Sequence, residues 1–221
     1  MIQSHRYALI GVGGAVTVAA VSAAILSSGA PAASSRALLC GGDHRWDVKT
    51  LSDPATNLVH YATPKKHTIL YMISLIDPHV GINTARDADG SHVELTVYRL
   101  IGVRLFNARI EDDGDVHLVI QDKYQRKMIV EFPNTVCKGA TGSTHKAEMK
   151  QARDNFTSLC GLPTWRTRTT KASPRDLIGT ASLEGVGFFD LKHGTPQVGV
   201  APNNIELHPV LRFSVENCHP T

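Results

Sequence analysis

The feature that most constrains the fold is the stretch from Glu94 to Pro133, which reads as three strands joined by two turns. Its first segment is rich in β-branched and aromatic residues and too irregular in period for an amphipathic helix, which favours one long, bent strand. The first turn contains an Asp-Gly pair, a strong hairpin signal because both residues tolerate positive φ. Segments and turns alternate at 94–110, 111–115, 116–122, 123–127 and 128–132. The sequence therefore predicts an antiparallel meander with carboxylates at one end and cations at the other.

The segments after this meander complete a known order of elements. Residues 143–159 space apolar side chains at helical intervals behind a serine cap, and residues 181–190 and 205–215 are predicted as two further strands. Three strands, a helix and two strands is the order of an OB-fold, a small barrel. We therefore predict a mainly β fold (β+α): a five-stranded OB-like Greek-key barrel with one helix between strands 3 and 4.

The residues before the meander are predicted to be an extension rather than a second domain. We expect residues 33–93 to pack on the barrel and residues 94–221 to form the OB-fold-like domain. Within the extension, the alternation around Trp46 and Val48 predicts an edge strand or a cover for the barrel, and residues 68–76 favour a short helix weakly.

The N-terminal residues 1–32 resemble a secretory signal peptide. A short basic segment precedes an apolar run and small residues of the Ala30-x-Ala32 type, so cleavage is expected after Ala32. A retained membrane anchor is the alternative, because the run approaches the 20 or so residues that span a bilayer. We expect a secreted or extracytoplasmic protein with no membrane span in its mature form.

The four cysteines are widely spaced and form no CxxC pair, which in an exported chain favours two disulfides over a zinc site. Of the three possible connectivities we favour Cys137 with Cys160 and Cys40 with Cys218. Four buried free thiols are the alternative, and would suit a reducing compartment.

The formal net charge of +3 is too small to imply a nucleic-acid or membrane partner by itself. A local basic cluster is a candidate for binding nucleic acid or another anionic polymer, although a solvated loop face would look the same. The cluster consists of Arg166, Arg168, Lys171 and Arg175. The oligomeric state stays open.

At its two central turns the chain resembles the staphylococcal-nuclease type of OB-fold. The resemblance rests on Asp113-Gly-Asp-Val-His-Leu118, on Arg126 five residues before Glu131, and on Pro133 two residues later. It implies that Asp115 and Glu131 bind a calcium-like ion and that Arg126 holds a phosphate. The chain departs from the family in having Asn134 where the family has its general-base glutamate. Residues 185–190 and 205–209 resemble uncharacterised exported bacterial proteins instead.

A second constellation lies on the last predicted strand. Glu206 and His208 are two residues apart, so their side chains should point to the same face, where Glu206 could join the metal ligands. His117 should face solvent or a groove, because its neighbours are apolar, and His117 or His208 is a possible acid or base. The alternatives are a structural hydrogen bond for Glu206 and His208 and a merely soluble acidic turn for the aspartates.

These residues lead to two hypotheses of function. The first is a divalent-metal-dependent nuclease or phosphodiesterase, with Ca²⁺ or Mg²⁺ favoured over Zn²⁺ because most candidate ligands are hard oxygens. The second is a non-catalytic module of the cell envelope that binds an oligonucleotide, an oligosaccharide or a protein. A purely structural envelope protein is a third possibility.

Overall fold

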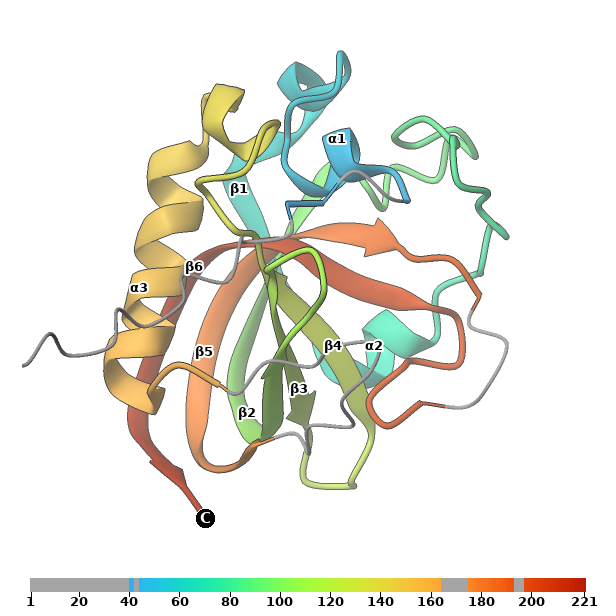
Figure 1. Ribbon diagram of the computed structural model, residues 1–221. Helices are drawn as coiled ribbons and strands as arrows, with labels where there is room; N and C mark the ends of the chain where they lie inside the picture. The colour runs from blue at the N-terminus through green and yellow to red at the C-terminus, as the bar shows by residue number, and fades with distance from the viewer. Residues whose placement is uncertain (1–39, 42–43, 164–174, 193–196) are drawn as a thin grey trace, which may run out of the picture. The chain divides into compact units, whose positions relative to one another are not determined.

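The computed structural model describes residues 40–41, 44–163, 175–192 and 197–221, all within one compact unit that spans 37–221 (Figure 1). Residues 1–32, for which we predict a signal peptide, lie outside the described part. The fold is mainly β, with a few helices around one mixed sheet. Its strands are β1 (His60–Lys66), β2 (Thr96–Ile110), β3 (Val116–Gln121), β4 (Lys127–Phe132), β5 (Arg175–Phe189) and β6 (Ile205–Pro220).

Five of these six strands close a ring of hydrogen-bonded pairs. The sheet order is β1-β2-β3-β4-β6-β5, and β2 also pairs with β5, so the ring runs through β2 to β6. The β4–β6 pair is parallel, and the other pairs within the ring are antiparallel. The β2–β3–β4 meander predicted from the sequence is confirmed.

The sixth strand was not predicted. β1 pairs with β2 in parallel at the edge, outside the ring. Most of its side chains are exposed and it contains Pro64, so it lacks the alternation and the full set of amide donors that identify a strand in a sequence. The prediction of five strands is therefore wrong, because the described part of the chain has six.

The principal helix, α3 (Lys146–Cys160), lies between β4 and β5 in the chain, as predicted, and packs along β6 (Figure 1). Its inner face buries Phe156 against Phe132 of β4 and Phe213 of β6, with ring centroids 5.2 and 5.6 Å apart. Edge-to-face and offset aromatic contacts of this kind add to the burial of apolar area. This packing fixes the helix against the end of β4 and the middle of β6.

Two short helices belong to the segment before the ring. α2 (Ile69–Ile73) confirms the weak helix prediction, and the Thr68 hydroxyl caps it by accepting from the Tyr71 amide at 3.2 Å. α1 (Trp46–Lys49) is helical, so the edge strand predicted there is wrong. The alternative prediction was that this segment covers the barrel. The backbone amides of Lys49 and Thr50 donate to carbonyls four residues earlier, and the preceding Arg45 has a left-handed backbone, with φ of 62°, which ends any extended run.

The disulfides join Cys40 to Cys137 and Cys160 to Cys218, so the pairing favoured from the sequence is wrong. The reason is the long β5–β6 pairing and the course of α3. The helix runs along β6 and brings its last residue, Cys160, to Cys218 near the end of that strand. Two disulfides fit an extracellular protein. No helix within the described ranges is long and apolar enough to cross a membrane.

Candidate functional site

The turn between β2 and β3 places the first candidate ligand, Asp115. The Glu111 amide donates to the Asp115 carbonyl at 2.9 Å, and an Asp113 carboxylate oxygen accepts from the Asp115 amide at 3.0 Å. Gly114 has φ of +87°, and a Cβ there would lie 2.7 Å from the Asn134 side-chain nitrogen. Only glycine suits this position, which holds Asp115 at the start of β3.

Three neighbouring strand regions bring a carboxylate, a second carboxylate and an imidazole together. Asp115 precedes β3, Glu131 lies on β4 opposite His117, and His208 lies on β6, which pairs with β4. One ligand atom from each of Asp115, Glu131 and His208 lies within 4.8 Å of the others, so this group can hold a metal ion. We call these three residues the DEH cluster.

The DEH cluster is buried but incompletely hydrogen-bonded. Asp115 Oδ1 accepts from the Asn134 amide at 2.7 Å. His208 Nε2 lies 3.3 Å from Asp115 Oδ2, and His208 Nδ1 lies 3.0 Å from Glu131 Oε2. Despite these distances, both His208 nitrogens and Asp115 Oδ2 lack a partner in hydrogen-bond geometry among the described residues. Buried polar atoms are normally satisfied, and a bound ion or water is one way in which these atoms of the DEH cluster would be.

Contacts within the DEH cluster favour the charged forms of His208 and Glu131, although burial opposes them. Burial alone would lower the pKa of His208, but contacts with Asp115 and Glu131 raise it overall. Burial would raise the pKa of Glu131, whereas His117, His208 and Lys49 hold it well below its usual range. The imidazole and the Glu131 carboxylate thus stabilise each other's charged forms.

His117 is part of the same network, and the expectation that it faces solvent or a groove is wrong. Its side chain is 5% exposed, and Nδ1 lies 2.8 Å from Glu131 Oε1. Arg109 and Glu111 complete its surroundings: Arg109 Nη2 lies 3.4 Å from His117 Nδ1 and Arg109 Nε donates to Glu111 at 2.6 Å. The Glu131 and Glu111 carboxylates thus compensate the His117 and Arg109 side chains, so this face of β3 is polar and nevertheless buried.

Two further carboxyl groups border the DEH cluster. Glu206, predicted as a ligand, is buried nearby on β6 but does not belong to the group within 4.8 Å, and burial, Glu131 and Asp190 raise its pKa well above the usual range. Asp113 is partly buried, and this burial together with the Asp115 and Glu131 carboxylates raises its pKa to about 7. Glu206 therefore tends to be neutral, and Asp113 can exchange a proton near neutral pH.

Sequence reasoning missed Lys49, a buried cation whose charge acts on Glu131 of the DEH cluster. Lys49, the last residue of α1, has a side chain only 10% exposed and lies 4.0 Å from an Asp190 carboxylate oxygen. No local pattern in the sequence indicates that a lysine so far upstream reaches the acidic strands. Arg153 of α3 donates to the Gly114 and Phe132 carbonyls at 2.8 and 2.7 Å, and so ties the turn before β3 to the end of β4.

Arg126 lies at the other end of the hairpin. It belongs to the turn between β3 and β4, where Nε donates to an Asp122 carboxylate oxygen at 2.6 Å, whereas Glu131 pairs with His117 near the opposite end of the strands. The structure does not bring Arg126 to Asp115 and Glu131.

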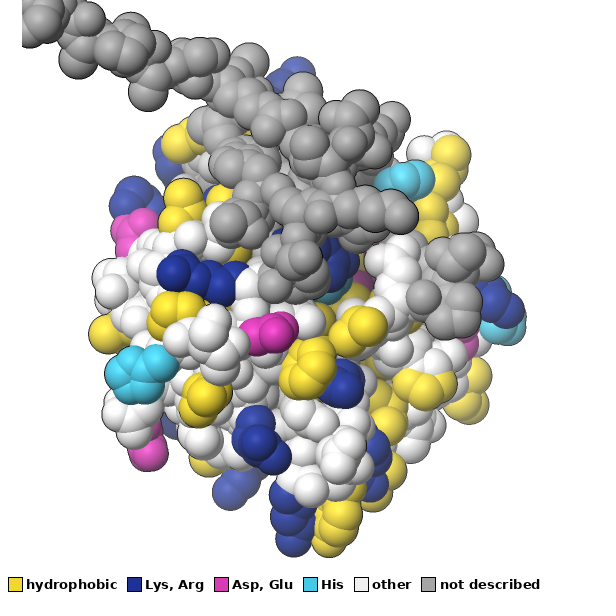
Figure 2. All heavy atoms as spheres, turned by 60° about the horizontal axis from the view of Figure 1, so that its bottom comes forward, with side chains coloured by type: hydrophobic (Ala, Val, Ile, Leu, Met, Phe, Trp, Pro, Cys, Tyr) yellow, Lys and Arg dark blue, Asp and Glu magenta, His cyan; other side chains and the backbone are white. Residues whose placement is uncertain are grey.

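Figure 2 shows the molecule turned so that the bottom of Figure 1 comes forward. On this face the Lys and Arg side chains are scattered among neutral and apolar ones.

The predicted basic cluster can be followed at one position only. Arg175 begins β5, and its guanidinium donates to the Leu162 carbonyl at 3.5 Å. The other three members, Arg166, Arg168 and Lys171, lie outside the described residues.

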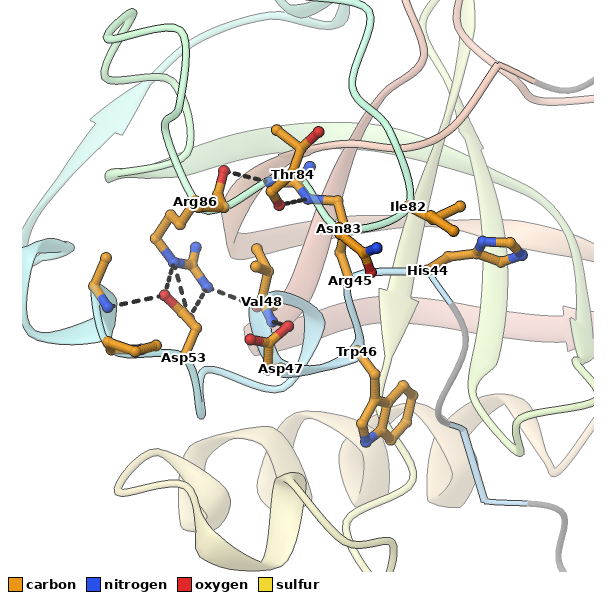
Figure 3. A pocket seen from close by; sticks show the side chains of 13 residues that line it. His44, Arg45, Trp46, Asp47, Val48, Asp53, Ile82, Asn83, Thr84 and Arg86 are labelled. Atoms are coloured by element: carbon orange, nitrogen blue, oxygen red, sulfur yellow. Dashed lines mark hydrogen bonds and ion pairs between the residues drawn. The ribbon is translucent and has the colours of Figure 1, made fainter.

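A pocket of about 690 Å³ lies beside α1, apart from the DEH cluster. Trp46, Asp47 and Val48 line it, and Arg86 and Asp53 point toward one another at its side (Figure 3). Its arginines are fully engaged: Arg86 Nη2 lies 2.8 Å from Asp53, and Arg45 Nη2 lies 2.6 Å from Glu94, which lies outside the pocket lining. α1 therefore contributes to both places, with Lys49 directed to the carboxylates.

Comparisons with family models, with curated proteins and with solved structures found no match to this chain.

Proposed function

We propose that this protein is an exported, OB-fold-like phosphodiesterase that acts on nucleic acid with a divalent cation held by the DEH cluster. The observation that carries the proposal is the convergence of Asp115, Glu131 and His208, with unaligned polar atoms, at one end of a closed ring of strands. The two disulfides support export.

The strand order supports the OB-fold assignment. Numbered within the ring alone, β2 to β6 follow the order 1-2-3-5-4 and return to 1, with α3 between the third and fourth strands. This agrees with the five-stranded Greek-key barrel, to which β1 would be an addition. Loops at the ends of OB-fold strands bind oligonucleotides and oligosaccharides in many proteins, and the turn at 111–115 is such a loop.

The donor set suits a small divalent ion. Ligand atoms within 4.8 Å of one another fit ligand distances of about 2.0 to 2.6 Å, which cover Zn²⁺, Mg²⁺ and Ca²⁺. The imidazole of His208 makes Mn²⁺ and Zn²⁺ as suitable as Mg²⁺, whereas Ca²⁺ takes six to eight oxygens. Such an ion supplies Lewis acidity toward a phosphoryl oxygen and lowers the pKa of water.

The chain's own side chains would serve the remaining steps. Asp113 lies in the turn directly before Asp115 and is only partly buried, so its carboxylate is the candidate to take a proton from a water molecule. Arg153 positions the site by holding the Gly114 and Phe132 carbonyls, without contacting substrate itself. Asn134, where the nuclease family has a glutamate, contributes its backbone amide to Asp115.

A non-catalytic binding module is the second candidate, and one observation favours it. Asp115 and His208 are fully buried and Glu131 is 6% exposed, as expected for an ion that stabilises the fold rather than one that meets substrate. In that case the ion would raise stability without any hydrolysis.

An assay of hydrolysis separates the two. Purified protein is incubated with single-stranded DNA, double-stranded DNA, RNA and bis(p-nitrophenyl) phosphate, with Mg²⁺, Mn²⁺, Zn²⁺ or Ca²⁺ or with chelator. We expect ion-dependent cleavage that Glu131→Gln abolishes and Glu216→Gln, which changes an exposed carboxylate of β6, leaves intact. Ion-dependent stabilisation without cleavage of any substrate would contradict the enzyme and support the module.

A further inference from the structure

Two residues position Lys49 near the DEH cluster: Arg45, which anchors the start of α1, and Phe188, whose ring packs on both Lys49 and His208. Arg45, just before α1, is anchored by two hydrogen bonds to Glu94 at 2.8 and 2.6 Å and one to the Phe189 carbonyl at 2.8 Å. The ring of Phe188 lies 5.4 Å from Lys49 Nζ and its centroid lies 5.5 Å from that of His208. α1 is therefore held in place, and its lysine has an aromatic wall on one side.

The acidic groups around Lys49 include one member of the DEH cluster, Glu131. Burial alone would lower the pKa of Lys49, but the charges of its acidic neighbours, Glu131 and Asp190 first, outweigh this and raise the pKa above its ordinary value. The ammonium group thus stays charged while its side chain is 10% exposed. Lys49 Nζ lies 4.0 Å from an Asp190 carboxylate oxygen and 5.4 Å from the ring of Phe188, which also packs on His208, so a divalent ion in the DEH cluster would lie near a fixed positive charge.

We infer that Lys49 is a built-in counter-cation of the DEH cluster, which neutralises the carboxylates in the absence of an ion and weakens the binding of a divalent cation. The inference rests on the proposed metal site and adds the residue that sets its affinity. Two cations that face the same carboxylates in a poorly screened interior repel each other, and the repulsion grows with the charge of the ion. The site would then bind its ion reversibly rather than retain it.

Isothermal titration of chelator-treated protein with Mn²⁺ tests this inference. Lys49→Met keeps the length and apolar stem without the charge, and should bind Mn²⁺ at least roughly tenfold more tightly than the unaltered protein. Lys49→Arg keeps the charge and should bind within about threefold of the unaltered protein. Lys146→Met removes an exposed lysine at the start of α3 and controls for the loss of one positive charge.

The outcomes are distinguishable from those of the proposed function. If the unaltered protein binds Mn²⁺ and Lys49→Met binds it no more tightly than Lys146→Met does, the role of Lys49 is overturned while the metal site stands. If neither the unaltered protein nor Lys49→Met binds Mn²⁺, both fall. Binding by Lys49→Met alone supports the inference.

Thermal unfolding provides a second readout. In chelator, Lys49→Met should unfold at a lower temperature than the unaltered protein, because its carboxylates lose their counter-charge. Saturating Mn²⁺ should then stabilise it by a larger increment. Should this variant fail to fold in chelator, Lys49→Gln, which keeps a polar head among the carboxylates, is titrated in its place. Equal increments in the variant and the unaltered protein would contradict the inference.

Discussion

Two buried ionic networks in this protein differ in how completely their polar atoms are paired. In the arginine network, Arg45 forms a bidentate pair with Glu94, and Arg86 donates three bonds to Asp53 at 2.8 to 3.2 Å. Arg86 also donates to the Glu94 and Val48 carbonyls. The DEH cluster is equally buried, but His208 and Asp115 have atoms without an aligned partner among the described residues.

The difference indicates two uses of buried charge. A closed network of planar guanidinium groups ties the segment around α1 to Glu94, just before β2, and to the end of β5, and its polar groups are paired with one another. The open network of carboxylates and an imidazole has oxygen and nitrogen atoms without a hydrogen-bond partner among the described residues, which can serve as metal ligands. The first should therefore matter for stability whether or not an ion is present, and the second should matter for stability mainly through the ion it binds.

The largest effect should come from breaking the closed network. Arg86→Met leaves the Asp53 carboxylate buried and uncompensated, which should lower the free energy of unfolding by about 3 to 5 kcal/mol. Guanidinium chloride denaturation measures this loss, and Mn²⁺ should not restore it. Arg99→Met is the matched control, because the side chain of Arg99 is 54% exposed in its pair with Glu184 and should contribute less than about 1 kcal/mol. Equal losses in the two variants would contradict the comparison.

The open network should respond in ion affinity instead. Glu131→Gln removes one charged ligand while keeping a polar side chain beside His117, and should reduce Mn²⁺ affinity at least roughly tenfold, or about 1.4 kcal/mol. Thermal unfolding with and without Mn²⁺ measures the change as a lost increment of stability. An unchanged increment would show that the ion, if any, binds elsewhere.

A pH titration of stability sharpens the contrast further. Burial would raise the pKa of Asp53, but hydrogen bonds and charge from Arg86 outweigh it and lower the pKa. Because the folded-state pKa lies below the ordinary value of about 3.9, this pair contributes fully at neutral pH and its contribution is lost as pH falls below about 4. Urea denaturation in chelator between pH 6 and 3 should show this loss, and Asp53→Asn should lack that part of it. The same slope in both proteins would remove Asp53 as its source.

The smallest effect should be that of Arg126→Ala. Arg126 is paired with Asp122 in a half-exposed turn, so its removal should change the free energy of unfolding by less than about 1 kcal/mol. Mn²⁺ affinity should stay the same, because the turn is at the opposite end of the hairpin. A loss of ion affinity or hydrolysis in this variant would restore the role in phosphate binding that the family resemblance implies.

The parts of the site that the sequence predicts are those fixed by local geometry. The Asp-Gly pair predicts the turn that positions Asp115, and the two-residue period of a strand relates Glu206 to His208. The antiparallel pairing of β3 and β4 then places Glu131 opposite His117. Each inference needs only neighbouring residues or one turn.

The parts that sequence reasoning missed depend on contacts between distant segments. Lys49 lies beside Asp190 and Phe188, and Arg45 anchors the start of α1 to Glu94 and to Phe189, which lies 144 residues away from Arg45. The pairing of Cys160 with Cys218 depends on how α3 runs along β6. Arg126 was assigned to the site from its spacing to Glu131, but five residues of strand separate the two ends of a hairpin.

The central claim is that Asp115, Glu131 and His208 bind one divalent ion. Diffraction from crystals soaked in Mn²⁺, recorded at a wavelength where manganese scatters anomalously, tests this most directly. We predict one anomalous peak about 2.0 to 2.6 Å from a carboxylate oxygen of Asp115, one of Glu131 and a ring nitrogen of His208. A fully soaked crystal with no peak there, or with His208 still between both carboxylates and manganese bound only at surface groups, would contradict it.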